Sequence, residues 1–200
     1  MRISKLVPSL PLALLLAGCG DRASGGNENE VITTVTLTFT PAAGGPPTVA
    51  RFDDPDGDGG SPPKIDPIDL VAGMFHLTVG FENRLETPPA NITDEIRDES
   101  DEHQVFFTGT AVNSPASNQP GAPLAQAYAD MDVHGLPIGL ASEVTATAGS
   151  GTLTVTLRHM PPLNGVAVKT SGLAAAVRER GFSGIGGSTD AQVSLPVTVR

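Results

Sequence analysis

The chain has 200 residues, of which 23 are Gly and 18 are Pro, and it contains no Trp, one Tyr and one Cys. Its net charge of −10 at pH 7 argues against nucleic acid as a partner and against charge-driven adhesion to anionic lipid headgroups. A single Cys excludes an intrachain disulfide, and the high Gly and Pro content predicts short strands joined by many turns.

The N-terminus resembles a bacterial lipoprotein signal. Arg2 and Lys5 precede an apolar run, LPLALLLAG, that is too short to span a bilayer permanently. LAGC then resembles a lipobox, in which the peptide is cut before the cysteine and the cysteine carries the lipid; an ordinary secretory peptide is the alternative. We predict a signal peptide over residues 1–18, a lipid anchor on Cys19 with a flexible tether over residues 19–30, and one domain over residues 31–200.

Alternating apolar and polar residues predict about seven to nine antiparallel strands. The clearest runs lie at 31–39, 48–52, 74–83, 104–112, 124–132, 142–148, 151–160 and 191–200. The aromatic run QVFFTGTAV (104–112) is expected in the centre of a sheet, and Pro196, which has no amide N–H, suggests that the last strand is an edge strand. The pattern predicts an all-β fold, an immunoglobulin-like β-sandwich, with a β-barrel as the alternative.

One short acidic helix is expected within NITDEIRDESDEH (91–103), with Ile92 and Ile96 as its apolar stripe. On a helix, carboxylates spaced four residues apart share a face and can share a cation, although a solvated acidic face is the alternative. The candidate metal ligands here are Glu99, Glu102 and His103.

The loop DPDGDGG resembles a calcium-binding loop. Asp54, Asp56 and Asp58 precede a glycine, and Ca²⁺ takes six to eight oxygen ligands of this kind. Pro62 and Ile65 stand where such a loop normally supplies further ligands, so a polar turn between strands is the alternative. Ca²⁺ is the one cofactor that the sequence suggests.

YADMDVHG repeats the same spacing with Asp130, Asp132 and His134. A neutral imidazole suits a transition metal better than Ca²⁺, and an Asp-rich turn is the alternative. Of the other two histidines, His76 is expected on an exposed strand face, and His159 as a hydrogen-bonded residue at the end of a buried strand.

We predict that the protein is not an enzyme. The sequence has no zinc-enzyme motif such as H-E-x-x-H and no G-x-S-x-G nucleophile motif. The glycine-rich GIGGSTD lacks the lysine of a phosphate-binding loop, and one Tyr without Trp argues against a polysaccharide hydrolase.

Motifs along most of the predicted domain resemble a family of small uncharacterised lipoproteins of Bacteroidota-type bacteria. They are VITTVTLTFTP, FDDPDGDGG, NITDEI, DEHQVFF, YADMDVHGLPIGL, GTLTVTLRHMP and TDAQVSLPVTV. The resemblance implies a lipid-anchored β-sandwich and supplies no catalytic residues. Such proteins are sometimes labelled periplasmic-binding-like, but that fold needs alternating strands and helices, which this sequence does not show.

The leading functional hypothesis is a lipid-anchored, non-enzymatic binding or accessory module of the cell envelope, stabilised by Ca²⁺ if the loop binds it. The alternative is a metal-handling protein that presents a cation to an outer-membrane transporter. Both place a monomer on the outer membrane through its lipid, with an envelope protein as the partner and no nucleic acid. Gly20 after the cysteine resembles the outer-membrane sorting signal of proteobacteria.

Overall fold

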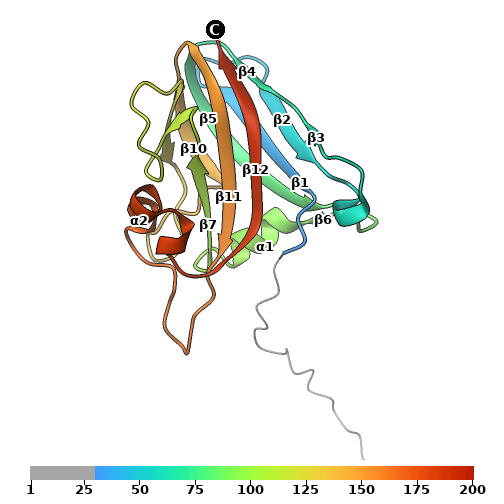
Figure 1. Cartoon of the computed structure of the whole chain (residues 1–200), viewed down its shortest axis with the longest axis vertical. Helices are drawn as coiled ribbons and strands as arrows, with labels where there is room; N and C mark the ends of the chain where they lie inside the picture. The colour runs from blue at the N-terminus through green and yellow to red at the C-terminus, as the bar shows by residue number, and fades with distance from the viewer. Residues whose placement is uncertain (1–29) are drawn as a thin grey trace, which may run out of the picture.

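The computed structural model of the protein describes residues 30–200 and consists of two β-sheets packed face to face (Figure 1). The predicted signal peptide, Cys19 and the tether up to residue 29 lie outside the described residues. Sheet A has the order β3 (Lys64–Ile65), β2 (Thr48–Asp53), β1 (Thr34–Pro41), β5 (Gly73–Asn83), β10 (Ala141–Ala146), β9 (Leu124–Tyr128), β8 (Val112–Asn113), and β6 (Ala90–Asn91) also pairs with β5. Sheet B has the order β4 (Ile68–Leu70), β12 (Ser188–Val199), β11 (Gly149–His159), β7 (His103–Thr108).

The predicted all-β class is confirmed, with the expected short acidic helix α1 (Ile92–Asp98). A second helix, α2 (Leu173–Arg180), and two 3₁₀ turns, η1 (Gly57–Gly59) and η2 (Phe182–Gly184), complete the regular structure. Two short pairings, β4 with β12 and β8 with β9, are parallel, whereas the sequence suggested antiparallel pairs throughout. Neither helix of residues 30–200 is long and apolar enough to cross a membrane.

Strict alternation in the long strands builds the core. In β5 the side chains of Phe75, Leu77, Val79 and Phe81 are buried, while most of the intervening residues are exposed. The same alternation in β12 buries its four apolar residues from Val193 to Val199. Each such side chain contributes about 1.5–3 kcal/mol when it is removed from water, so the packing of the two inner faces dominates the stability of the sandwich.

The end of the sandwich at which the described chain begins is called here the tether end. β1 starts there opposite the end of β5, where Thr34 pairs with Glu82. β12 also starts there, with Ser188 opposite His159 at the end of β11. Helix α1 covers this end, because its only apolar residues, Ile92 and Ile96, are buried in the same core cluster as the strands. The C-terminus lies at the opposite end (Figure 1).

The prediction that residues 104–112 form a central strand is wrong, because β7 lies at the edge of sheet B. The strand is nevertheless buried on both faces, since α2 and the segment after it cover its outer side. Phe106 packs there with Met160, Leu173 and Val177, and its ring meets that of Phe182 edge to face at 5.5 Å. The high aromatic content of this segment therefore reflects burial on both faces of the strand and not a central position in the sheet.

The last strand, β12, lies between β11 and β4 and is not a simple edge strand. β4 pairs only with Val197–Val199, so most of β12 has one side without a neighbouring strand in the described sheet. Pro196 lies just outside this short pairing, which agrees with the requirement that proline sits where no ladder hydrogen bond is lost.

A buried ion pair joins three loops near the tether end. Lys169 Nζ lies 2.7 Å from Asp132 Oδ2, with both side chains fully buried, and donates to the carbonyl oxygen of Ser100 at 2.7 Å. Burial alone would raise the pKa of Asp132, but hydrogen bonds from Lys169 and from two backbone N–H groups hold that pKa below its usual value. The stability that this carboxylate contributes is therefore lost as the pH falls through its pKa in the folded state.

Replacing Lys169 with Met is expected to lower the free energy of unfolding by about 3–5 kcal/mol, because Asp132 is left as an uncompensated buried charge. Urea denaturation measures this loss. The matched control is Lys64→Met, which removes an ion pair with Asp66 whose lysine side chain is 80% exposed, and it is expected to cost at most about 1 kcal/mol. Equal effects of the two substitutions would contradict a structural role for the buried pair.

Candidate metal centre at the tether end

Two histidines meet at the tether end because β7 and β11 are paired in antiparallel register. His103 begins β7, His159 ends β11, and the two residues lie directly opposite each other. Both are in phase with core residues of their strands, Val105 and Leu157, so their side chains share the inner face of the sheet. The rings stack with centroids 4.5 Å apart and an interplanar angle of 7°. His103 is 0% and His159 7% exposed.

Glu99, the C-cap residue directly after α1, supplies a carboxylate to the same place. Its backbone carbonyl oxygen lies 3.1 Å from Nδ1 of His103, which leaves Nε2 of that ring as the other coordinating atom. One ligand atom from each of Glu99, His103 and His159 lies within 4.8 Å of the other two. Atoms that share a zinc ion at bonds of 2.0–2.1 Å are separated by about 3–4 Å, so the three ligand atoms have to move closer together. The two stacked rings also have to tilt away from their parallel arrangement before both imidazole lone pairs point at one ion.

A β-bulge in β12 directs a second carboxylate towards the histidines. Leu157 pairs with Ala191 and Arg158 with Thr189, so Asp190 is left over in the register. The side chain of Asp190 is fully buried, and its Oδ2 lies 3.9 Å from Nε2 of His103. Bulges commonly redirect side chains next to functional sites, and here the bulge places an acid beside a buried imidazole. Glu102 approaches from the other side, with Oε2 3.6 Å from Nε2 of His159.

Several polar atoms of this cluster are buried without a hydrogen bond from any residue that the structure describes. They are Nε2 of His103, Nδ1 of His159 and both carboxylate oxygens of Asp190. A buried polar atom left without a partner costs about 1–3 kcal/mol. A bound cation would satisfy exactly the kind of lone pairs that these atoms carry, so the donor set fits a metal ion.

The protonation states also suit a metal. Burial, with smaller contributions from His159 and Lys169, lowers the pKa of His103 to about 4 against the opposing effect of its hydrogen bond to Glu99. The ring is therefore neutral at pH 7, which is the form that binds metals. Burial raises the pKa of Asp190 to about 6, with the charges of His159 and Arg158 opposing the shift.

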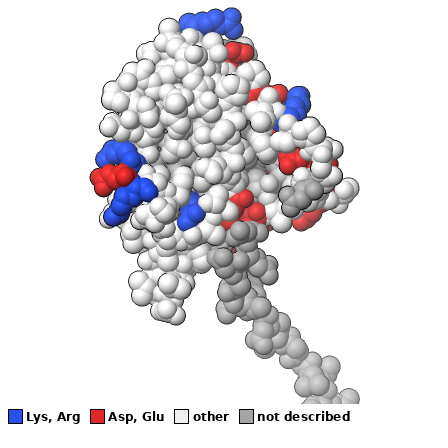
Figure 2. Space-filling model, viewed as in Figure 1, with Lys and Arg blue, Asp and Glu red and all other residues white. Residues whose placement is uncertain are grey.

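Glu30, the first residue that the structure describes, belongs to the same acidic surroundings. Burial, together with the nearby carboxylates of Glu95, Glu99 and Asp190, raises its pKa to about 7. It also forms a side-chain hydrogen bond with Glu95. Figure 2 shows acidic side chains gathered where the chain enters the domain. The negative potential of this region favours a cation.

The ligand types indicate the class of metal. Two imidazoles with a carboxylate are typical of zinc, copper, nickel and iron sites, whereas Ca²⁺ and Mg²⁺ prefer oxygen ligands alone. The predicted ligands Glu99 and His103 thus lie in the cluster, and Glu102 lies at its edge. His159 and Asp190 were not among the predicted ligands. The sequence did show that His159 ends a buried strand, which could have suggested a buried histidine. It did not show that β7 pairs with β11 or that β12 has a bulge at Asp190.

The aspartates of the second predicted loop bind backbone amides. Asp130 accepts hydrogen bonds from the N–H groups of Gly139 and Ala141 at 2.8 and 2.9 Å. Asp132 Oδ1 accepts from two N–H groups within its own turn, and its Oδ2 faces Lys169. His134 is exposed and does not join these carboxylates in a ligand cluster. A metal bound by Asp130, Asp132 and His134 stays a prediction.

The first predicted loop contains η1 and follows β2. Asp56 Oδ2 accepts from the N–H of Ser61, and a Cβ on Gly59 would lie 2.7 Å from that same oxygen, which explains the glycine. Asp54 lies at the start of the turn, where its carbonyl oxygen accepts from the N–H of Gly57, and the side chain of Asp58 is outside what the structure describes. Calcium binding by Asp54, Asp56 and Asp58 stays a prediction.

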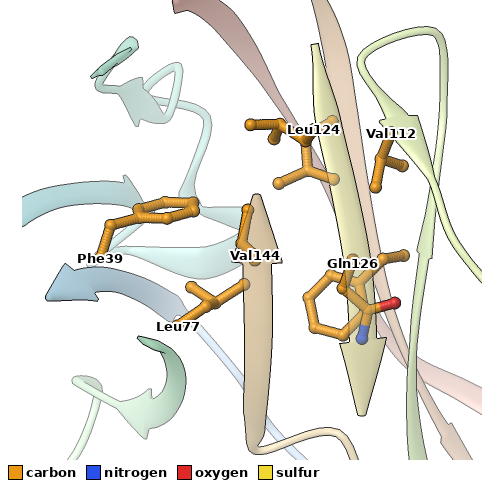
Figure 3. A pocket seen from close by; sticks show the side chains of 8 residues that line it. Phe39, Leu77, Val112, Leu124, Gln126 and Val144 are labelled. Atoms are coloured by element: carbon orange, nitrogen blue, oxygen red, sulfur yellow. The ribbon is translucent and has the colours of Figure 1, made fainter. Parts of the chain in front are cut away.

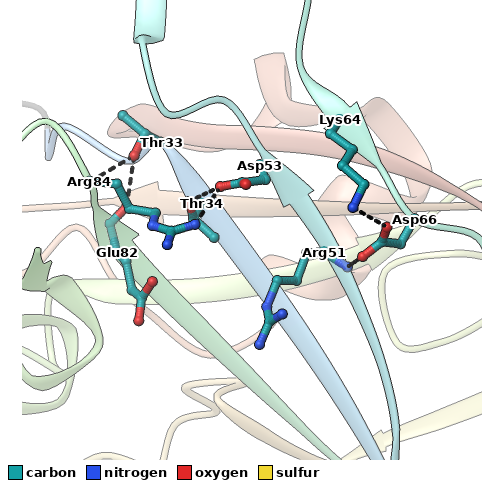
Figure 4. Close-up of polar contacts among 8 residues, drawn as sticks. All are labelled: Thr33, Thr34, Arg51, Asp53, Lys64, Asp66, Glu82 and Arg84. Atoms are coloured by element: carbon teal, nitrogen blue, oxygen red, sulfur yellow. Dashed lines mark hydrogen bonds and ion pairs between the residues drawn. The ribbon is translucent and has the colours of Figure 1, made fainter.

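Neighbouring acids that could have completed a calcium site are engaged elsewhere (Figure 4). Asp53 accepts from Thr34 Oγ1 at 2.8 Å and from Arg84 Nη1 at 3.0 Å. Asp66 accepts from the N–H of Arg51 and faces Lys64 at 3.7 Å. These contacts fasten the loop to β1, β2 and the end of β5.

Two other concave regions are weaker candidates for a functional site. The gap around Leu124 and Val144 (Figure 3) has no space for even a water molecule, and its polar residue, Gln126, donates to Ser142 Oγ at 2.8 Å. An open groove of about 550 Å³ at the C-terminal end carries Asp69 and Arg200 as its charged residues. In the described part of the chain, the histidine cluster is thus the best candidate site.

Comparisons with protein-family models, with curated proteins and with solved structures found no match to this chain. The functional argument therefore rests on the fold and on the geometry of the histidine cluster.

The substitution Asp130→Ala is expected to lower the free energy of unfolding by about 1–3 kcal/mol, because two backbone N–H groups lose their acceptor. Urea denaturation in EDTA and in millimolar CaCl₂ should give the same loss, since the role is structural. The exposed neighbour Met131→Ala is the control and is expected to have little effect. A loss seen in calcium and absent in EDTA would assign Asp130 to an ion instead.

Calcium binding at the first loop has a direct thermal test. An ion that binds only the folded state adds about 2.7 kcal/mol of stability when its concentration is 100 times Kd, so millimolar Ca²⁺ should raise the Tm relative to EDTA. Asp56→Ala should abolish that difference, whereas Asp66→Ala, whose carboxylate is engaged by Arg51 and Lys64, should preserve it. Identical Tm values in Ca²⁺ and EDTA would identify the loop as a polar turn.

Proposed function

We propose that this chain is a lipid-anchored, non-enzymatic module of the cell envelope that binds one divalent transition-metal ion at the tether end of its β-sandwich. The observation that carries the proposal is the buried pair His103 and His159, which forms one cluster of ligand atoms with the Glu99 carboxylate. Each ring also has one buried nitrogen without a hydrogen bond from a described residue. The lipobox at Cys19 and the resemblance to small Bacteroidota-type lipoproteins support the anchor and the outer-membrane location.

The burial of the cluster favours holding a metal over catalysis. Structural metal sites are closed, whereas catalytic sites keep a coordination position open to substrate. Here His103 and the side chain of Asp190 are fully buried, and α1 covers the end of the sandwich. Glu99 is exposed and Glu102 half-exposed, which gives an ion a route to solvent. This route agrees with the metal-handling hypothesis, in which the cation passes to an envelope partner.

Isothermal titration of the purified chain with Zn²⁺, Cu²⁺, Ni²⁺ and Ca²⁺ tests the proposal. The Cys19→Ala variant is used because a free thiolate would itself bind soft metals. One site is expected for Zn²⁺ or Cu²⁺, and none of comparable affinity for Ca²⁺ at the histidines. Glu99→Ala and His159→Ala should each weaken binding at least about tenfold.

The controls separate binding from folding. Glu99 is exposed, so Glu99→Ala should leave the Tm of the metal-free protein almost unchanged. His76→Ala and His134→Ala remove the two exposed histidines and should leave the affinity unchanged. Metal affinity that survives loss of Glu99 and His159, or that depends on His134, would overturn the proposed site.

A further inference from the structure

A rigid, uncharged protrusion extends from the tether end. It comprises residues 161–168, PPLNGVAV, and is called here the tip hairpin. Leu163 and Val166 pair through two backbone hydrogen bonds of 2.9 and 3.0 Å. Between them Asn164 and Gly165 have φ angles of 52° and 77°, which is the pattern of the tight Asn-Gly hairpin turn. The Asn-Gly pair thus gives the tip the form of a tight hairpin turn.

The tip hairpin presents apolar side chains to solvent. Leu163 and Val166 are each 68% exposed. The neighbouring loop between β9 and β10, which the Lys169–Asp132 ion pair ties to the segment after the hairpin, exposes Met131 and Val133 as well. In Figure 2 the protrusion shows neither acidic nor basic atoms on the visible face. Grouped exposed apolar residues mark a surface that another apolar phase covers.

The position at which the described chain begins indicates that this apolar phase is a lipid bilayer. The tip hairpin and the start of the described chain extend from the same end of the sandwich (Figure 1). Cys19 is separated from Glu30 by ten residues, so at full extension the lipid attachment point lies within roughly 40 Å of the domain. The tip hairpin is therefore within reach of the bilayer that receives the lipid.

We propose that Leu163 and Val166 insert into the headgroup–acyl boundary of the membrane that holds the lipid anchor. This inference rests on the lipid anchor of the proposed function and does not require the metal. An acyl anchor supplemented by a second apolar contact is a recurrent way of fixing a protein on a bilayer. The contact orients the domain, so that the acidic tether end and its histidine cluster face the membrane surface.

Charge selects the kind of lipid. Glu30, Glu95 and Glu99 lie at the same end of the domain, and their repulsion disfavours an anionic surface. The uncharged tip therefore suits zwitterionic lipid such as phosphatidylethanolamine. Many lipid-anchored proteins reinforce the anchor with a cluster of basic residues that binds anionic headgroups. The tip hairpin contains no basic residue, so it cannot make such a contact.

The absence of Trp from the sequence permits a single-fluorophore test. The lipidated full chain carrying Leu163→Trp is reconstituted in phosphatidylethanolamine–phosphatidylcholine vesicles whose acyl chains are brominated near the headgroup. Its emission should shift to shorter wavelength and fall by about half or more, as expected for a side chain 5–10 Å into the boundary region. Val71→Trp, at a 69% exposed position of the C-terminal end, should show neither change.

Three outcomes are informative. Quenching of Leu163→Trp that disappears when Val166→Asp is added supports insertion. Lipidated protein that floats with the vesicles but leaves Leu163→Trp unquenched overturns the inference and assigns the tip to a protein partner. Failure of the chain to float, with Cys19→Ala behaving like the unsubstituted protein, overturns the lipid anchor itself. Adding Zn²⁺ or EDTA should not alter the quenching, which keeps this test separate from that of the metal site.

Discussion

The packing of Ile92 and Ile96 against the core closes one end of the sandwich, and the candidate site depends on that closure. Two stacked sheets leave their interior open at each end, where buried strand residues would otherwise meet water. Helix α1 covers the tether end with two isoleucines and one turn later presents Glu99 to the histidines. The apolar contact that seals the core thereby excludes water from His103 and lowers its pKa.

The acidic residues of this chain divide into two structural roles. Asp53 at the end of β2, and Asp130 and Asp132 in the loop after β9, accept hydrogen bonds from backbone amides or from basic side chains, so their charges are already compensated. At the tether end, burial raises the pKa of both Glu30 and Asp190, and repulsion from the carboxylates of Glu95, Glu99 and Asp190 adds to the shift of Glu30. Aspartate spacing alone cannot separate these roles, because it does not show which partner each carboxylate meets after folding.

The sequence was sufficient for the fold class and for most of the strands. Alternation located β1, β2, β5, β11 and β12 to within a few residues, and the two isoleucines of α1 identified its buried face. The order of the strands in each sheet depends on long-range pairing that local patterns do not contain. Glu99 and His103 were predicted as ligands on one helix face, but α1 ends at Asp98 and His103 begins β7, so it is the chain reversal after the helix that keeps the two residues close. His159 was expected only as the end of a buried strand. Its partner strand brings it to His103 from 56 residues away in the chain.

The bulge at Asp190 has a consequence for how such a site can arise or disappear. Side chains in a strand alternate between faces, so one extra residue reverses the facing of everything on one side of it. Deleting a single codon here would restore regular pairing between β11 and β12 and leave the sandwich intact, while removing the acid from the histidines. Closely related chains can therefore share every strand and differ, through one insertion, in whether an acid faces the histidines, a change that comparisons limited to substitutions would overlook.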